Sequence, residues 1–83
     1  MKILKFYADW CNPCKQQTKI LDSMSLEVTP VNIEDDDSEE LVKKYNIMSV
    51  PVLVFLNDEG EEVRRFVGLT TKDTLEDFIK ENG

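Results

Sequence analysis

Histidine is absent from this 83-residue chain, and basic residues are scarce. Without histidine, neither Cys–His nor Ser–His catalysis is available, and most zinc chemistry is excluded as well. Lysine and arginine together number 10 against 17 acidic residues, which gives a net charge of −7. Binding to nucleic acid needs clustered basic side chains that neutralise phosphates, so the composition argues against it.

Long hydrophobic runs are also missing. No apolar run approaches the ~20 residues that a membrane-spanning helix needs. The first nine residues are too short and too quickly charged to form a signal peptide. The sequence therefore predicts a cytoplasmic protein that does not associate with a membrane. The chain has 41% hydrophobic and 33% charged residues, without repeats or low-complexity segments, and we expect a single folded domain over residues 1–83.

The pattern of apolar residues predicts seven elements in the order β-α-β-α-β-β-α. Strands are expected over 2–7, 27–33, 52–56 and 62–67, and helices over 13–24, 38–45 and from Thr70 or Thr71 onward. Residues 52–56 are all apolar, which is typical of a strand covered on both faces. Pro30 favours an edge position for 27–33, because proline cannot donate to a ladder. The order indicates an α/β fold with a mixed four-stranded sheet, with 2–7 and 52–56 in its centre.

The helix starts are predicted from capping residues. Asp37 or Ser38 is expected to cap the second helix, which runs through Tyr45. For the last helix, Thr70 and Asp73 have the spacing of a capping box.

Two cysteines separated by two residues, Cys11 and Cys14, are open to four interpretations. The four interpretations are a structural disulfide, half of a zinc site, two buried cysteines without a function, and a redox dithiol. Their position at the junction between a strand and a helix favours the dithiol. The positive end of a helix favours a thiolate at Cys11, while Cys14 lies one turn further in and is more shielded. An exposed attacking thiol and a covered partner are what disulfide exchange requires.

Residues 6–15, with the sequence FYADWCNPCK, resemble the active-site stretch of the thioredoxin family. Residues 32–34, 45–51 and 68–71 resemble later parts of that family, including the approach to its cis-proline. The likeness covers nearly the whole chain, but the family's usual first strand and helix are missing, as in short phage and archaeal thioredoxin-like proteins and in glutaredoxins. The resemblance implies a minimal thioredoxin fold with three helices flanking the sheet.

The resemblance also implies roles for individual residues. Cys11 is then the nucleophile that attacks a substrate disulfide, and Cys14 resolves the mixed disulfide. Pro51 is then cis and faces the cysteines, whereas an ordinary proline at a strand start would be trans. Trp10 is expected to be an exposed contact surface, with a core position as the alternative. The substrate-binding residues are expected to be Trp10, Asn12, Pro13, Val50, Pro51 and Gly68.

Lys5 departs from the family pattern, because it stands where the family has a buried acid behind the resolving cysteine. Pro30 stands near the position of that acid's lysine partner. Two interpretations of Lys5 are open. Its ammonium group reaches solvent, or it lies beneath the cysteines as a catalytic residue. In the second case it lowers thiol pKa values or, when neutral, accepts a proton from Cys14.

The leading functional hypothesis is a general reductant of disulfide-containing protein substrates, recycled by a flavin-dependent thioredoxin reductase. It is expected to be monomeric and to need no cofactor and no metal ion. One alternative is a glutaredoxin-like reductase that uses glutathione, although residues 68–71 lack the second glycine and the paired aspartate of a glutathione site. The other is a protein-binding module of the same fold with an incidental dithiol.

Overall fold

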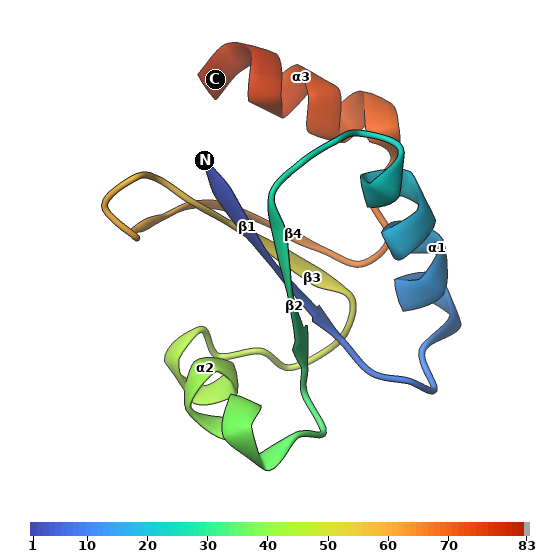
Figure 1. Ribbon diagram of the computed structural model, residues 1–83, viewed down its shortest axis with the longest axis vertical. Helices are drawn as coiled ribbons and strands as arrows, with labels where there is room; N and C mark the ends of the chain where they lie inside the picture. Colours follow the sequence, from blue (N-terminus) through green and yellow to red (C-terminus); the bar gives the residue numbers. More distant parts are fainter. Residues whose placement is uncertain (83) are drawn as a thin grey trace.

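The computed structural model describes residues 1–82 and contains one mixed four-stranded sheet with helices on both faces (Figure 1). The strands are β1 (Lys2–Tyr7), β2 (Val28–Asn32), β3 (Val52–Leu56) and β4 (Glu62–Val67). The helices are α1 (Asn12–Asp22), α2 (Glu39–Lys44) and α3 (Lys72–Asn82), and a 3-10 turn, η1 (Asp36–Ser38), precedes α2. The predicted order of strands and helices is confirmed.

The strand order in the sheet is β2-β1-β3-β4. β1 runs parallel to β2 and antiparallel to β3, and β3 runs antiparallel to β4. All five residues of β3 are buried, as expected for an apolar strand in the sheet centre. Pro30 lies on the edge strand β2 and pairs in register with Lys5 of β1. The predicted centre of the sheet and the predicted edge position of residues 27–33 are therefore confirmed.

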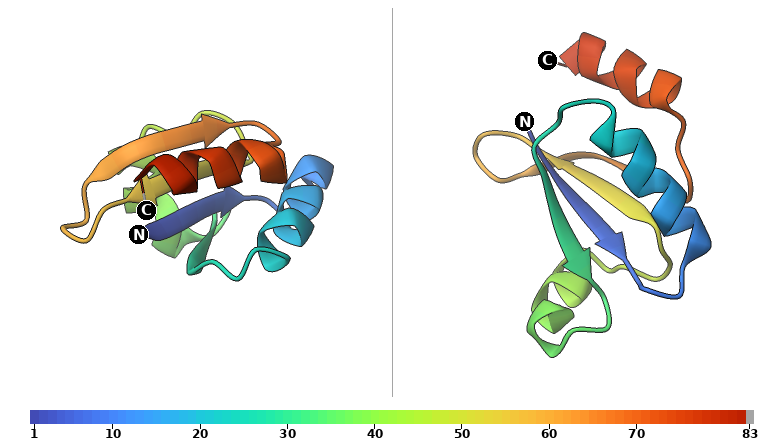
Figure 2. Two further views of the ribbon diagram at one scale, coloured as in Figure 1. Left: turned by 90° about the horizontal axis from the view of Figure 1, so that it is seen from above. Right: turned by 45° about the vertical axis from the view of Figure 1, so that its right-hand side comes forward.

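Each face of the sheet has its own apolar core because side chains alternate along the strands. α1 and α3 cover one face, and α2 covers the other (Figures 1 and 2). The buried residues of the first core are Ile3, Leu21, Leu53, Phe55, Phe66 and Leu75. Those of the second are Leu4, Phe6, Val31, Tyr45, Val52, Val54 and Leu56. β1 is therefore packed on both faces before the chain leaves it for α1.

The predicted helix starts are confirmed in position and differ in their capping bonds. Ser38, one of the two predicted residues, is the N-cap of α2, but its side chain makes no capping bond, because η1 runs directly into the helix and Ser38 already has a helical conformation, with φ −90° and ψ −6°. At α3 the cap is Thr71, whose Oγ1 accepts from the Thr74 N–H at 3.3 Å. Thr70, in the predicted capping box, is buried instead.

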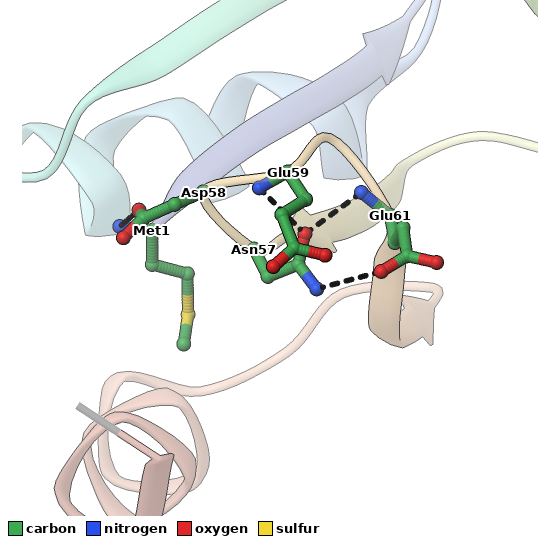
Figure 3. Close-up of polar contacts among 5 residues, drawn as sticks. All are labelled: Met1, Asn57, Asp58, Glu59 and Glu61. Atoms are coloured by element: carbon green, nitrogen blue, oxygen red, sulfur yellow. Dashed lines mark hydrogen bonds and ion pairs between the residues drawn. The ribbon is translucent and has the colours of Figure 1, made fainter.

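Asn57 organises the turn between β3 and β4, at the end of the sheet where the chain begins (Figure 3). Its Oδ1 accepts from the backbone N–H groups of Glu59 at 3.0 Å and Glu61 at 2.9 Å. Gly60 has a φ of 84°, a conformation that side-chain-bearing residues rarely adopt. Asn57 thus supplies bonds that the backbone alone does not.

Replacing Asn57 with alanine is expected to lower the free energy of unfolding by about 1–2 kcal/mol, because two turn N–H groups lose their acceptor. Urea denaturation measures the loss. The matched control is Asp58→Ala, since the Asp58 side chain is fully exposed and only faces the N-terminal ammonium at 3.7 Å. It is expected to change stability by less than ~0.5 kcal/mol. Equal losses in both variants would contradict the role given to Asn57.

Candidate functional site

Cys11 lies at the N-cap of α1, three residues after Ala8, where the chain turns from β1 into the helix. Its Sγ accepts from the backbone N–H of Cys14 at 3.1 Å. Cys11 and Cys14 form a disulfide, with their Cα atoms 5.2 Å apart. Pro13 lies in the first helical turn, where a missing N–H leaves no helix bond unmade. The predicted position of the two cysteines at a strand-to-helix junction is confirmed.

The predicted difference in exposure between the cysteines is small in this disulfide form. Cys11 is 4% exposed and Cys14 is 2% exposed. The expectation of an exposed Cys11 is therefore wrong for this form, because the disulfide packs into an apolar cluster with Ala8. Tyr7, Ile33 and Val50 pack against that cluster. The surface above the disulfide is consequently made by neighbouring side chains.

Val50 and Pro51 come from the loop before β3, and the fold brings them to the cysteines. The Val50–Pro51 peptide bond is cis, as the family resemblance predicts. Pro51 is buried, and Val50 packs against the cysteine cluster. The Gly68 N–H donates to the Pro51 carbonyl at 2.8 Å, and Gly68 has a φ of 88°. Segments far apart in the sequence thus meet at one end of the sheet.

The rim of this site carries exposed apolar side chains. Trp10 is 66% exposed, so its alternative position in the core is wrong. Asn12 and Pro13 are exposed beside it. Three further exposed apolar residues, which were missed in the sequence, lie in the chain segments next to Val50 and Gly68: Met48, Val67 and Leu69. Their signal was available, because each lies within two residues of Val50 or Gly68 in the chain.

Lys5 is 8% exposed, so most of its side chain lies against the protein. Its Nζ donates to Thr18 Oγ1 at 2.6 Å, and the Thr18 hydroxyl donates to the Cys14 carbonyl at 3.0 Å. Lys5, Thr18 and Cys14 also line one cavity of about 290 Å³. Thr18 was missed in the sequence, although it lies four residues after Cys14 and hence on the same face of α1.

Burial lowers the pKa of Lys5, and the nearby Asp22 carboxylate opposes this effect. A lowered pKa means that the charged lysine is less favourable in the folded protein than in the unfolded chain. Folding is therefore less favourable at any pH at which Lys5 is charged in the folded protein. That cost is full below the folded pKa and disappears as the pH rises from the folded pKa to the ordinary lysine value of 10.5.

We therefore expect Lys5→Met to raise the free energy of unfolding at neutral pH, by about 1 kcal/mol. Urea titrations at increasing pH are expected to show this gain shrinking as the wild-type lysine loses its proton. Lys19→Met is the control, because Lys19 is an exposed lysine on α1. Its removal is expected to change stability by less than ~0.5 kcal/mol. A gain that stays constant with pH would contradict the assignment to burial of charge.

Neither a metal centre nor a membrane span is found in the part of the chain that the structure describes. No group of three or more cysteine and acidic side chains within residues 1–82 is placed to hold a metal ion. No helix in this range is long and apolar enough to cross a membrane.

Comparison with known proteins gives consistent matches. The Thioredoxin family model matches residues 1–81. A thioredoxin from Chlamydia trachomatis is 36% identical over 83 residues, covering 96% of this chain and 80% of that protein. The SPbeta prophage-derived thioredoxin-like protein YosR of Bacillus subtilis is 32% identical over 81 residues, covering 98% of both chains. The solved structure of a mutant thioredoxin from Halobacterium salinarum superposes with a TM-score of 0.85 at 31% identity, covering 96% of this chain and 72% of that one.

The matches agree with the fold and with the Cys11–Cys14 pair at the start of α1. Together they identify a thiol–disulfide oxidoreductase with protein-disulfide reductase activity. Disulfide substrates and a thioredoxin reductase are the partners that such proteins have in general. On the family model, the relatives and the minimal four-stranded fold, the chain belongs to the thioredoxin family.

Proposed function

We propose that the chain is a general reductant of protein disulfides in which Cys11 attacks and Cys14 resolves. The observation that carries the proposal is the position of Cys11 at the N-cap of α1, with the Cys14 N–H donating to its sulfur at 3.1 Å. After reduction, the same N–H and the positive end of the helix would stabilise a Cys11 thiolate. Cys14 follows one turn later, within bonding reach of Cys11.

The proposed reaction has two exchange steps. In the first, the Cys11 thiolate attacks one sulfur of the substrate disulfide, and the other substrate sulfur leaves as a thiolate. In the second, the Cys14 thiolate attacks Cys11 Sγ, the bond between Cys11 and the substrate breaks, and the second substrate thiolate leaves. Both leaving thiolates take protons from solvent. Two electrons pass from the protein dithiol to the substrate, and the Cys11–Cys14 disulfide closes.

The substrate chain is proposed to lie across the rim of the site. Its contacts are assigned to Trp10, Asn12, Pro13, Val50, Pro51 and Gly68. The exposure of Trp10 supports a contact surface, and the packing of Val50 against the cysteine cluster supports a role beside the reacting sulfurs. An extended substrate segment would pair with the backbone of Val50, as in strand addition. A Cβ added at Gly68 would meet nothing within 4 Å, so the space beside Gly68 is open to a substrate.

The proposed electron donor is a flavin-dependent thioredoxin reductase rather than glutathione. Residues 68–71 lack the second glycine and the paired aspartate of a glutathione site. The Thr70 backbone is also engaged, because its N–H donates to Gln17 Oε1 at 2.8 Å and its carbonyl accepts from Gln17 Nε2 at 3.1 Å. The proposal places the protein in the cytoplasm as a monomer, with residues 1–83 as one domain.

The test is reduction of insulin disulfides with three electron sources in parallel. Thioredoxin reductase with NADPH is expected to support turnover, and glutathione with its reductase is expected to support at most about a tenth of that rate. Dithiothreitol serves as the third source and reports whether the dithiol is active at all. Faster turnover with glutathione would assign a glutaredoxin-like function. Absence of turnover with every source would favour the protein-binding module.

A further inference from the structure

Lys5 is the one charged residue among the buried side chains of residues 1–82, and the exchange steps proposed above do not use it. Three contacts define its surroundings. Its Nζ donates to Thr18 Oγ1 at 2.6 Å, and it lies 5.3 Å from the centre of the Tyr7 ring. It also lines the cavity that Cys14 lines. A buried charge that shares a cavity with the resolving cysteine calls for a functional explanation.

Thr18 fixes the direction of the lysine bond. Because the Thr18 hydroxyl hydrogen is donated to the Cys14 carbonyl at 3.0 Å, only lone pairs of Oγ1 remain for Lys5, which must be the donor. The bond of 2.6 Å is short, as in hydrogen bonds from a charged donor. The face of the Tyr7 ring also favours a cation. One bond at Thr18 leaves the other N–H groups of an ammonium available toward the cavity.

We propose that Lys5 acts as an ammonium that stabilises the Cys14 thiolate while substrate is released, and that Thr18 is the residue that positions it. This inference rests on the proposed resolving role of Cys14. In the release step the Cys14 proton passes to solvent, and Lys5 keeps its own proton throughout. The thiolate then attacks Cys11 Sγ as described above. Lys5 acts only through its positive charge, so it neither gains nor loses a proton during the cycle.

Burial opposes the charge of Lys5, and the Asp22 carboxylate favours it. Titratable groups that face Lys5 or share its cavity come from two parts of the chain. Tyr7 and Asp9 precede α1, and Cys14, Lys15 and Asp22 lie on α1. Strand β2 contributes only Pro30, which carries no charge. The only thiol among them is Cys14, whose anion is the charge that appears during release.

The test follows release directly. Reduced protein is mixed with an excess of a fluorogenic peptide disulfide, so that attack by Cys11 is fast and a second phase reports release. An opposite charge nearby changes the population of a thiolate about 10- to 1000-fold below its titration midpoint. A less stabilised thiolate is intrinsically more nucleophilic, which offsets roughly half of that factor on a logarithmic scale. Lys5→Met is therefore expected to slow release about 3- to 30-fold at low pH.

At high pH, where Cys14 is ionised in both proteins, the same variant is expected to release substrate as fast as the wild type or faster. The pH midpoint of release thus moves upward, and the two rate profiles meet or cross. Thr18→Ala is expected to shift the midpoint in the same direction, and Thr18→Ser to restore it. Lys19→Met, which removes an exposed charge from the same helix, is expected to leave the profile unchanged.

Each contrary result overturns a distinct part of the inference. An unchanged profile in Lys5→Met would show that Lys5 has no influence on release. Slower release at every pH would assign Lys5 as a neutral proton acceptor or as a structural residue. Unchanged profiles in both Thr18 variants would remove its positioning role. A wild-type protein without a second phase would instead refute the resolving role of Cys14, so failure of the proposed function is recognised separately.

Discussion

Replacing Cys14 with serine is expected to leave the protein attached to its substrate. Cys11 keeps its position at the N-cap of α1, so the first exchange step still occurs. The second step then depends on external thiols, which act at millimolar concentration, whereas a group held in the same molecule acts with an effective concentration many orders of magnitude higher. Turnover with insulin is therefore expected to fall at least about 10³-fold. Mass spectrometry under non-reducing conditions is expected to show the accumulated mixed disulfide.

The matched variant is Cys11→Ser, which keeps the other thiol but removes the proposed nucleophile. It is expected to lose turnover to a similar extent and to form no adduct, because the N-cap position, where a backbone N–H and the helix end stabilise a thiolate, belongs to Cys11 and not to Cys14. Both variants lose turnover, so the rate does not distinguish attack from resolution. The mixed-disulfide adduct does, because it is expected only in Cys14→Ser. If the adduct accumulated in Cys11→Ser and not in Cys14→Ser, the assignments would have to be exchanged.

The sheet was predictable because its signals are local. The apolar residues of 52–56 require cover on both faces, and Pro30 cannot donate within a central strand, so centre and edge follow from composition alone. The helix caps were less predictable. Thr70 has the local features of a cap, but Gln17, 53 positions away, takes both of its backbone groups, and the helix begins after Thr71 instead. A tertiary contact decides this boundary, and no local pattern contains it.

At the site, too, the features set by local sequence were predictable and those set by tertiary contacts were not. A strand followed by a cysteine and a proline-containing helix start predicts the two cysteines at a strand-to-helix junction, and this needs only local geometry. The surroundings of Lys5 do not follow from its strand position, because alternation along β1 gives the face but not the partner. That partner, Thr18, lies on α1, and its bond to Lys5 forms only when the helix packs on the sheet. The burial of both cysteines likewise depends on Val50, from a distant loop.

Gln17 gives the second large effect expected, and it concerns stability. Its side chain is completely buried, and its amide makes two hydrogen bonds with the Thr70 backbone, at 2.8 and 3.1 Å. Gln17→Leu keeps nearly the same volume but leaves a buried N–H and a buried carbonyl without partners. Each such group costs about 1–3 kcal/mol, so a loss of about 3 kcal/mol in the free energy of unfolding is expected.

That loss is a large fraction of the ~5–15 kcal/mol that stabilises a small domain, and it is expected to lower the melting temperature by about 12–24 °C. Urea and thermal unfolding measure it, with Gln16→Leu as the control, because Gln16 is exposed one position earlier on α1. A loss below ~1 kcal/mol for Gln17→Leu would mean that other contacts hold the Thr70 segment, such as the Thr70 hydroxyl bond to the Gly68 carbonyl at 3.1 Å.

The same bond pair has a consequence for the site, because Thr70 lies two residues after Gly68, whose N–H donates to the Pro51 carbonyl. Gln17 therefore joins the helix that carries both cysteines to the segment that supports the cis-proline loop. In Gln17→Leu, loosening of that segment is expected to raise the KM for insulin at a temperature where the protein is still folded. Reduction of a small disulfide that does not reach the rim is expected to change little. An equal effect on both substrates would place the defect at the cysteines rather than at the rim.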